Sequence, residues 1–283
     1  VLESFRHQFQ SFTLWSHEET GNAWTFKRDL MVKQWCREHD ILWKEFPSHG
    51  VVRGLKNRDE WSKLRNQRMS QSLNPLPEYW QRPSSDITSD QLSKNQLNRD
   101  YDLIITPQKG GRRESQQILT SFINSRAESY LKTISRPGIS ARHCSRLSTH
   151  IAYGTISVRE IEQKTQLAIK SYQSNHTAHA RNMGRNLEAF LSRLAWRCHF
   201  VQKLEQQPTL ETQCMHPAFE GMREPFHNEE YFEAWKNGKT GYPLIDACMR
   251  SLIANGWITF RMRAMLVSFA SYHLWLDWRK TAP

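Results

Sequence analysis

One segment, residues 70–108, constrains the fold of this chain more than any other feature of its sequence. It is rich in Ser, Pro, Asn and Gln and poor in aliphatic residues, so it lacks the side chains that build a core. This composition predicts an interdomain linker on the protein surface. The 283 residues are therefore expected to form two separate parts, residues 1–69 and residues 109–283.

The N-terminal part has the pattern of an α/β fold. Phe12–Ser16 and Ile41–Phe46 are short apolar runs typical of strands, and residues 23–39 between them carry apolar side chains at helical spacing. A strand, a helix and a strand in this order predict a βαβ unit with a parallel sheet. Two strands alone do not make a stable sheet, so we expect that earlier strands of this domain are missing.

The C-terminal part is expected to be helical almost throughout. A first helix should begin at Gly110–Gly111 and reach about Tyr130. Ser157 and Glu160 form a Ser-x-x-Glu capping box, which marks the start of another helix. Residues 180–204 carry a broad apolar stripe, which predicts a long amphipathic helix.

Two further helices are expected towards the end of the chain. Pro243 suits a first helical turn and Gly256 suits the position just after a helix, so one helix should lie between them. The segment Ile258–Trp278 is apolar nearly all round, which predicts a buried central helix.

Composition narrows the classes of protein and partner. The net charge, 39 basic minus 28 acidic residues, is +11, which favours nucleic acid, anionic lipid or phosphorylated cofactors as partners. The five cysteines are an odd number without Cys-x-x-Cys spacing, so we expect neither a disulfide framework nor a metal site. The sequence has no apolar run long enough to span a membrane and no signal-peptide pattern, so we expect an intracellular protein.

Two arginines share one face of the helix expected over residues 180–204. Arg193 and Arg197 lie three and seven residues after Phe190, so the three side chains fall on the same side. Like charges four residues apart repel by roughly 0.2–0.5 kcal/mol. One interpretation is a solvated face, and the other is an arginine pair that binds a phosphate or an anionic ring.

Two other features have a structural and a functional interpretation each. Arg261 and Arg263 lie in the most apolar segment, where they either form structural ion pairs or face a cofactor and a polar cleft. The run CSRLS, Cys144–Ser148, precedes a helical pattern and is either an ordinary N-cap or an anion-binding turn.

These features, in this order, resemble the photolyase/cryptochrome flavoproteins. The runs SRLSTHIAYGTISVREI and FLSRLAWRCHF are similar to two helical segments of that family. The stretch AWKNGKTGYPLIDACMRSLIANGW is very close to the family's hallmark, and SFASYHLWLDWR ends in its DWR triplet. Residues 15–61 resemble the second half of the family's antenna domain, so the resemblance covers nearly the whole chain.

The resemblance implies a fold and a cofactor. Residues 1–69 would be a partial Rossmann-like α/β antenna domain, residues 70–108 a linker, and residues 109–283 an all-α FAD-binding domain without its C-terminal part. FAD would be bound in a U shape in the helical domain. A second antenna chromophore of the folate or deazaflavin type is expected if the full antenna domain exists.

The resemblance also implies roles for single residues. Trp278 matches the middle member of the tryptophan chain through which light-driven electron transfer reduces the flavin. The cofactor-binding residues would be Tyr130, Cys144, Ser145, Arg146, Leu147, Ser148, Phe190, Arg193, Arg197 and Arg263, and the DNA-facing residues would be Trp196, Trp257, Phe260 and Arg261.

The chain departs from the dimer-repairing members of the family at three positions. Arg193 stands where they have Glu, Phe260 stands where they have Asn, and Pro225 takes the approximate place of the outer tryptophan. The chain also stops before the segment that supplies the innermost tryptophan, so we expect a partial or shortened form.

Three hypotheses about function follow. The first is an FAD-dependent, blue-light-driven photolyase, a carbon–carbon lyase that repairs pyrimidine dimers in ultraviolet-damaged DNA and acts as a monomer near the nucleoid. The second is a cryptochrome-type FAD photoreceptor that signals without repair, which Arg193 and Phe260 favour. The third is a helical nucleic-acid-binding protein without a cofactor.

Overall fold

The computed structural model describes residues 1–75, 78–79, 104 and 107–282. They form two compact units: residues 1–79 together with Cys198–Pro208, and residues 104–197 together with residues 209–282. Most of the predicted linker, residues 70–108, lies outside the described residues, so its interpretation as a linker stays a prediction.

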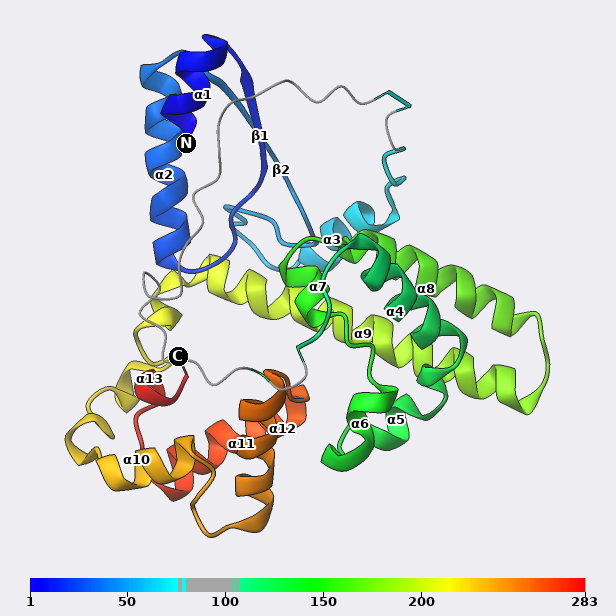
Figure 1. Ribbon diagram of the computed structural model, residues 1–283, viewed down its shortest axis with the longest axis vertical. Coiled ribbons are helices and arrows are strands. Elements are labelled where there is room, and N and C mark those ends of the chain that lie inside the picture. Colours follow the sequence, from blue (N-terminus) through cyan, green and yellow to red (C-terminus); the bar gives the residue numbers. More distant parts are fainter. Residues whose placement is uncertain (76–77, 80–103, 105–106, 283) are drawn as a thin grey trace. The chain divides into compact units, whose positions relative to one another are not determined.

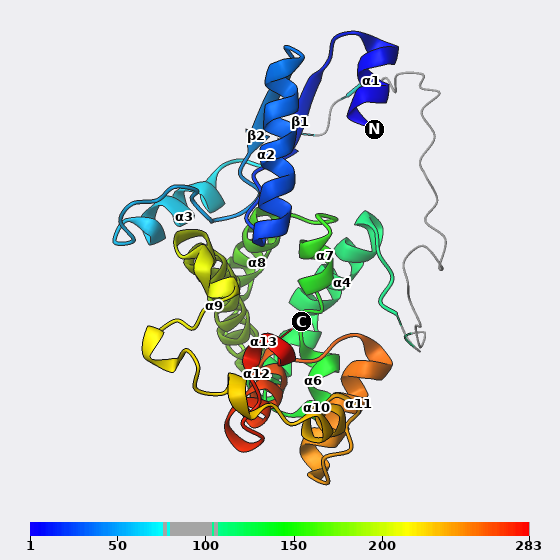
Figure 2. The same ribbon diagram turned by 90° about the vertical axis from the view of Figure 1, so that its left-hand side faces the viewer.

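The first unit has the expected strand–helix–strand order. Its two strands pair in parallel, with Thr13 opposite Leu42 and His17 opposite Phe46, and α2 packs beside them (Figures 1 and 2). The elements are α1 (Leu2–Phe9), β1 (Thr13–His17), α2 (Ala23–Glu38), β2 (Leu42–Phe46) and α3 (Trp61–Ser70).

The first unit leaves much apolar surface in solvent. The rings of Trp15 and Phe46 stack across the strands at 5.2 Å, yet Trp15 is 62% exposed. Trp24 on α2 is 73% exposed. The small sheet therefore buries only part of the apolar side chains that predicted it.

The end of a helix that begins in the second unit belongs to the first. Gln202, which is fully buried, donates from Nε2 to the Val52 carbonyl at 3.0 Å and accepts from the Val52 N–H at 2.7 Å. Arg58 donates to the His199 carbonyl at 3.1 Å. The first unit is thus built from two separate stretches of the chain, which no boundary in the sequence indicates.

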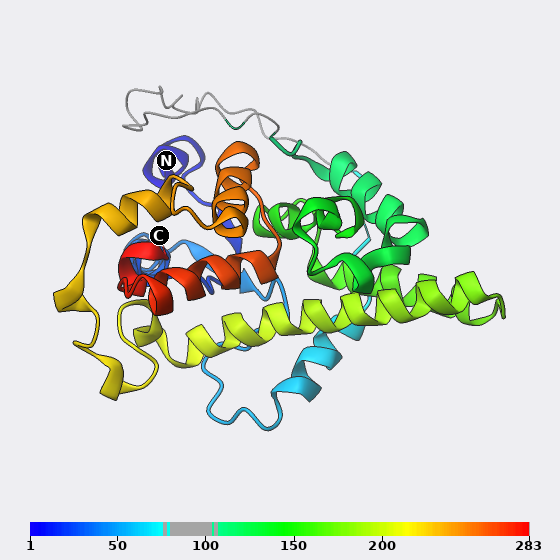
Figure 3. The same cartoon turned by 90° about the horizontal axis from the view of Figure 1, so that it is seen from below.

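The second unit is helical and contains no strand among its described residues. Figure 3 shows its longest helix, α9, as one unbroken segment. The elements are α4 (Arg112–Asn124), η1 (Arg126–Ser129), α5 (Tyr130–Thr133), α6 (Pro137–His143), α7 (Ser148–Ala152), α8 (Val158–Gln173), α9 (Ala178–Gln206), η2 (Pro208–Glu211), η3 (Pro217–Phe219), η4 (Glu224–Phe226), α10 (Glu229–Lys236), α11 (Pro243–Asn255), α12 (Phe260–Ser268), η5 (Phe269–His273) and α13 (Trp278–Thr281).

The capping signals lie where the sequence places them. The Ser157 hydroxyl accepts a hydrogen bond from the Glu160 N–H at 3.1 Å and begins α8. The Glu160 carboxylate binds Arg112 at 2.8 Å and so ties α8 to α4. Gly256 ends α11 with φ +62°, a left-handed conformation that favours glycine.

The turn before α11 is organised by one carboxylate. Asp246 accepts from the Thr240 N–H at 2.8 Å, from the Thr240 hydroxyl at 2.6 Å and from the Gly241 N–H at 3.0 Å. Burial opposes ionisation of Asp246, but these hydrogen bonds outweigh it and lower its pKa. The T-G-x-P-x-x-D run therefore supplies both the donors and the acceptor that order the turn at the start of α11.

The prediction of one buried helix over Ile258–Trp278 is wrong. The segment divides into α12, a π-helix (η5) and the short α13. Met262 and Leu266 face a core that α10 and α11 share, whereas Arg261 and Arg263 are exposed. An apolar composition did not distinguish a buried helix from a broken one that is buried on one side.

We expect Asp246→Ala to lower the free energy of unfolding by roughly 1.5–3 kcal/mol, because three donors lose a charged acceptor. A depressed folded-state pKa means that this contribution is complete above the ordinary Asp pKa of about 3.9 and is lost at lower pH. Denaturant unfolding at neutral and acidic pH measures both effects. Glu188→Ala, an exposed acid on α9, is the control, and an equal loss in both variants would contradict the assignment.

Candidate functional site

A half-buried guanidinium, that of Arg126, fixes the CSRLS turn. Arg126 donates to the carbonyls of Cys144, Ser145 (3.3 Å) and Ile118 (2.9 Å), and to the Ser121 hydroxyl at 3.0 Å. Burial lowers the pKa of Arg126, but an arginine remains charged at neutral pH. Sequence analysis missed this residue because nothing in the pattern marks an arginine that binds backbone oxygens.

The turn itself has an unusual backbone. Arg146 has φ +60°, which is uncommon for a residue other than glycine, and such conformations gather at functional sites. Leu147 is buried and takes the N-cap position of α7 without a side-chain cap bond. The ordinary N-cap interpretation of the serines in this run is therefore wrong.

Cys144 contributes its backbone rather than its thiol. Burial raises the pKa of this thiol to about 11, with Arg146 and Arg126 acting in the opposite direction. The thiol is therefore neutral at physiological pH, and the carbonyl is the group that binds Arg126.

A pocket brings together two residues that were assigned to different roles. The guanidinium of Arg146 lies 3.9 Å from the ring centre of Trp257, a cation–π contact. Both residues line a pocket of about 480 Å³, within the usual size range of small-molecule sites. Its other walls come from α6, α11 and α12, including Ser140, Cys248 and Met262.

Phe190 lies in a buried aromatic cluster. Its ring centre is 4.8 Å from that of Phe122 and 6.2 Å from that of Tyr130. Burial raises the pKa of Tyr130 to about 12, while Arg193, within hydrogen-bonding reach of its hydroxyl, acts to lower it. The predicted residues Tyr130, Phe190 and Arg193 are thus neighbours.

The two arginines of α9 have different environments. Arg193 is exposed and lies 5.8 Å from the ring of Trp196, which is itself 51% exposed. Nη1 of Arg197 is buried and has no hydrogen-bond partner among the described residues. An unpaired buried donor costs about 1–3 kcal/mol, so Arg197 has the surroundings of a ligand-binding arginine.

Three more buried polar atoms without a partner in the described part of the chain belong to residues that follow the CSRLS turn directly or form a hydrogen bond to it. They are Oγ1 of Thr149, Nε2 of His150 and Oε1 of Gln108. Gln108 is tied to the turn through its Nε2, which donates to the Arg146 carbonyl at 2.7 Å. Unpaired donors and acceptors of this kind fit a polar, anionic cofactor better than an apolar ligand.

The predicted residues of α12 lie at the surface. Phe260 is 72% exposed, and Arg261 and Arg263 are exposed on the same helix. Neither arginine pairs with a carboxylate within residues 107–282, so the interpretation as structural ion pairs is not supported there.

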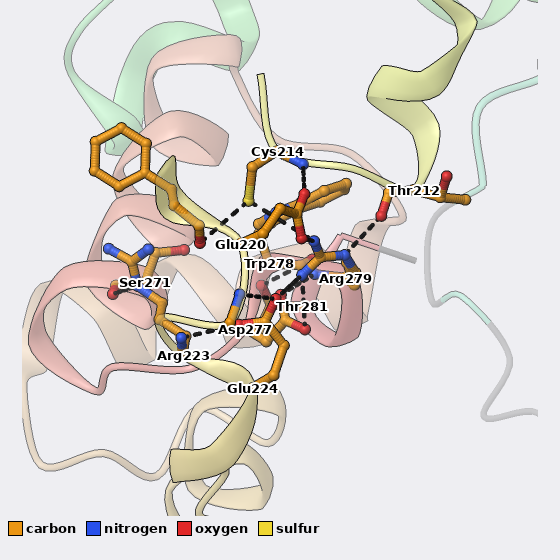
Figure 4. Close-up of polar contacts among 12 residues, drawn as sticks. Thr212, Cys214, Glu220, Arg223, Glu224, Ser271, Asp277, Trp278, Arg279 and Thr281 are labelled. Carbon is orange, nitrogen blue, oxygen red and sulfur yellow. Dashed lines mark hydrogen bonds and ion pairs between the residues drawn. The ribbon is translucent and has the colours of Figure 1, made fainter. Parts of the chain in front are cut away.

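Trp278 lies in a charged cluster that sequence analysis missed (Figure 4). Its ring centre is 5.1 Å from the guanidinium of Arg279, which binds Glu224 at 2.6 Å, Asp277 at 3.1 Å and also Glu220. Burial lowers the pKa of Arg279, whereas these carboxylates raise it. The net shift of this pKa is upward. The DWR triplet was the only sequence signal for this cluster.

Comparison with known families identifies residues 190–283. They match a family model described as the FAD binding domain of DNA photolyase. The match begins at Phe190 on α9 and includes Arg197, Trp257 and Trp278. This part of the chain is similar to the FAD-binding domain of the photolyases.

Named relatives agree with this similarity. A deoxyribodipyrimidine photo-lyase of Streptomyces griseus is 32% identical over 174 residues, which are 62% of this chain and 34% of the relative. That of Halobacterium salinarum is 33% identical over 48% of this chain and 27% of its own length. The chain thus spans about a third of the curated relatives that it matches.

Solved structures of the family share the fold. A Synechocystis cryptochrome has a TM-score of 0.77 at 21% identity and covers 100% of this chain and 59% of its own. A class III photolyase from Agrobacterium tumefaciens has a TM-score of 0.70 at 22% identity, covering 99% of this chain and 58% of its own. At these identities the likeness establishes the fold alone.

Other kinds of site were searched among the described residues. They contain no helix that is both long and apolar enough to cross a membrane. The described residues also contain no group of three or more His, Cys, Asp or Glu side chains arranged to hold a metal ion.

Replacing Arg126 tests its role in the turn. Arg126→Met keeps the apolar stem and leaves the carbonyls of Cys144 and Ile118 without their donor, so we expect a loss of roughly 2–3 kcal/mol in unfolding free energy. Amide hydrogen exchange at residues 144–147 should become faster. The control is Arg113→Met on the exposed face of α4. Unchanged amide hydrogen exchange in Arg126→Met would show that the turn keeps its conformation without Arg126.

Proposed function

We propose that this chain binds FAD in its second unit and uses it for blue-light-driven repair of pyrimidine dimers in DNA. The observation that carries the proposal is the buried Nη1 of Arg197, which has no hydrogen-bond partner among the described residues and lies on the helix where the family match begins. An arginine in this state is prepared for an anion, and FAD brings a diphosphate and, when reduced, an anionic ring.

The residues around the CSRLS turn suit the polar part of such a cofactor. Arg126 keeps the turn in one conformation, and Thr149 and His150 have buried polar atoms that still lack partners. Arg146 adds a second cation, whose pKa is lowered by burial and which stacks on Trp257. FAD, when bound, supplies blue-light absorption and exchange of single electrons.

The surface of the second unit suits damaged DNA as a partner. The net charge of the whole chain, +11, attracts the phosphate backbone. Trp196 on α9 and Phe260 on α12 expose aromatic rings that can stack on a base taken out of the helix, and Arg261 adds a cation next to Phe260. The assignment of these residues to DNA, and of Arg263 to the flavin, remains a proposal.

Trp278 is proposed to carry electrons to the flavin. An indole can lose one electron and regain it from a neighbour without making or breaking a bond to the cofactor. Its surroundings favour a positive charge on the ring, because Glu220, Glu224 and Asp277 are three carboxylates against the one guanidinium of Arg279.

Two features favour a second candidate, a cryptochrome-type photoreceptor that binds FAD and signals without repair. Arg193 lies beside Tyr130 as a cation where dimer-repairing relatives have a carboxylate, and Phe260 replaces an amide. A second, light-harvesting chromophore of the folate or deazaflavin type also remains a proposal. The archaeal photolyase of Sulfolobus tokodaii, 25% identical with a TM-score of 0.61, is described with two FAD molecules and a novel light-harvesting cofactor.

FAD content after purification tests the cofactor site. A charge-assisted contact contributes roughly 1.5–3 kcal/mol, so Arg197→Ala should weaken FAD binding about ten- to a hundredfold. Arg113→Ala, on the surface of α4, should retain the flavin. Full retention in Arg197→Ala would remove Arg197 from the site, and a colourless wild-type protein would favour the cofactor-free hypothesis.

Repair under blue light separates the two proposed functions. The chain should restore ultraviolet-irradiated oligonucleotides in the light and not in the dark, as measured by the number of dimers that remain. Arg193→Glu restores the carboxylate of the repairing relatives and should increase repair if that position limits it. Flavin binding without repair in both proteins would favour the photoreceptor.

A further inference from the structure

Trp275 has a backbone conformation that its residue type disfavours. The π-helix η5 ends at His273, and Trp275 follows the C-cap residue Leu274 with φ +57°. The Leu276 N–H then donates to the Ala270 carbonyl at 2.9 Å and closes the turn. Glycine usually takes such a position, and a bulky residue there is a strained exception that persists mainly at functional sites.

This conformation turns a large ring towards solvent between two buried neighbours. Leu276 is fully buried, and Leu274 packs against the core of α10–α12. Trp275 is 39% exposed. The turn therefore places an indole at the surface of the second unit without disturbing the core on either side of it.

A fixed arginine holds this ring. The guanidinium of Arg223 lies 4.5 Å from the ring centre of Trp275 and 5.4 Å from that of Tyr272. Its Nε donates to the Ser271 carbonyl at 2.9 Å, as Figure 4 shows. Cation–π contacts of this kind hold the ring in one orientation.

Trp275 is also close to Trp278. They are three positions apart in the chain, so their Cα atoms are at most about 11 Å apart. Trp278 is half-buried beside its charged cluster, whereas Trp275 reaches water. Of these two indoles, which are close in the sequence, Trp278 is therefore the more buried and Trp275 the more exposed.

We propose that Trp275 is the solvent-facing end of the electron path through Trp278. This inference rests on the proposed function, in which Trp278 loses one electron to a photo-oxidant of the flavin class. The oxidised Trp278 regains one electron from Trp275, whose indole then releases its N–H proton to water. A thiol in solution returns a hydrogen atom to Trp275, and two thiyl radicals combine to a disulfide.

The charge on Arg223 promotes the proton loss from Trp275 that completes this step. A guanidinium close to the ring disfavours a second positive charge there, so the oxidised indole loses its proton readily. Exposure of the ring supplies water as the acceptor of that proton. The unpaired electron then remains at the surface in a neutral Trp275 radical, which does not readily oxidise Trp278.

The test uses the full chain loaded with FAD and four single variants. Trp275→Phe and Trp278→Phe remove the two indoles and keep aromatic packing, Tyr272→Phe removes the other ring on Arg223, and Trp24→Phe is the control at a more exposed site. Flavin reduction under blue light with a thiol is measured first. Mass spectrometry then locates oxygenated tryptophan after illumination in air, and circular dichroism checks folding.

We expect Trp275→Phe and Trp278→Phe to lose most of the light-driven reduction and Trp24→Phe and Tyr272→Phe to keep it. Oxygenated product should accumulate at Trp275 in the wild type and disappear from it in Trp278→Phe. Normal reduction in Trp275→Phe, with loss in Trp278→Phe, would overturn the inference and leave the proposed relay intact. Normal reduction in Trp278→Phe would instead contradict the relay itself. Loss in Tyr272→Phe alone would move the outer end to Tyr272 and also overturn the inference.

Discussion

The guanidinium of Arg126 fixes the part of the second unit on which the candidate site depends. Its hydrogen bonds to the carbonyls of Ile118, Cys144 and Ser145 join α4 to the CSRLS turn. Burying a charge is costly, and here backbone dipoles rather than a carboxylate compensate for it. A cation that is not neutralised by an acid leaves a positive potential at the turn, where Arg146 adds to it.

The local signals in the sequence were sufficient for the helix starts and for the small sheet. Ser157 and Pro243 act within a few residues of themselves, so their roles can be predicted from spacing alone. The division of Ile258–Trp278 into three elements could not be predicted, because it depends on which side of the segment meets α10 and α11. The apolar composition of a segment indicates that the segment is buried, but it does not indicate where a helix ends.

For the candidate site, too, the sequence predicted some contacts and gave no indication of others. The motifs placed Tyr130, Phe190 and Arg193 together, and the structure makes them neighbours. The resemblance did not reveal that Arg146 stacks on Trp257, since the two are more than a hundred residues apart and carried different roles in the motif. Arg126 was missed for a further reason: its partners are mainly backbone oxygens, which leave no local pattern. The DWR triplet contains Arg279 and Asp277, but nothing in it indicates the distant partners Glu220 and Glu224.

The two-part origin of the first unit limits how this chain can be recombined. Because Gln202 on α9 supplies both hydrogen bonds to Val52, the α/β part cannot be exchanged with that of a relative by a single crossover near residues 70–108. Such a hybrid would combine a foreign sheet with the native end of α9 and leave a buried amide facing the wrong backbone. Exchange that preserves folding requires a second crossover around residues 198–208, so the two units are expected to change together during evolution.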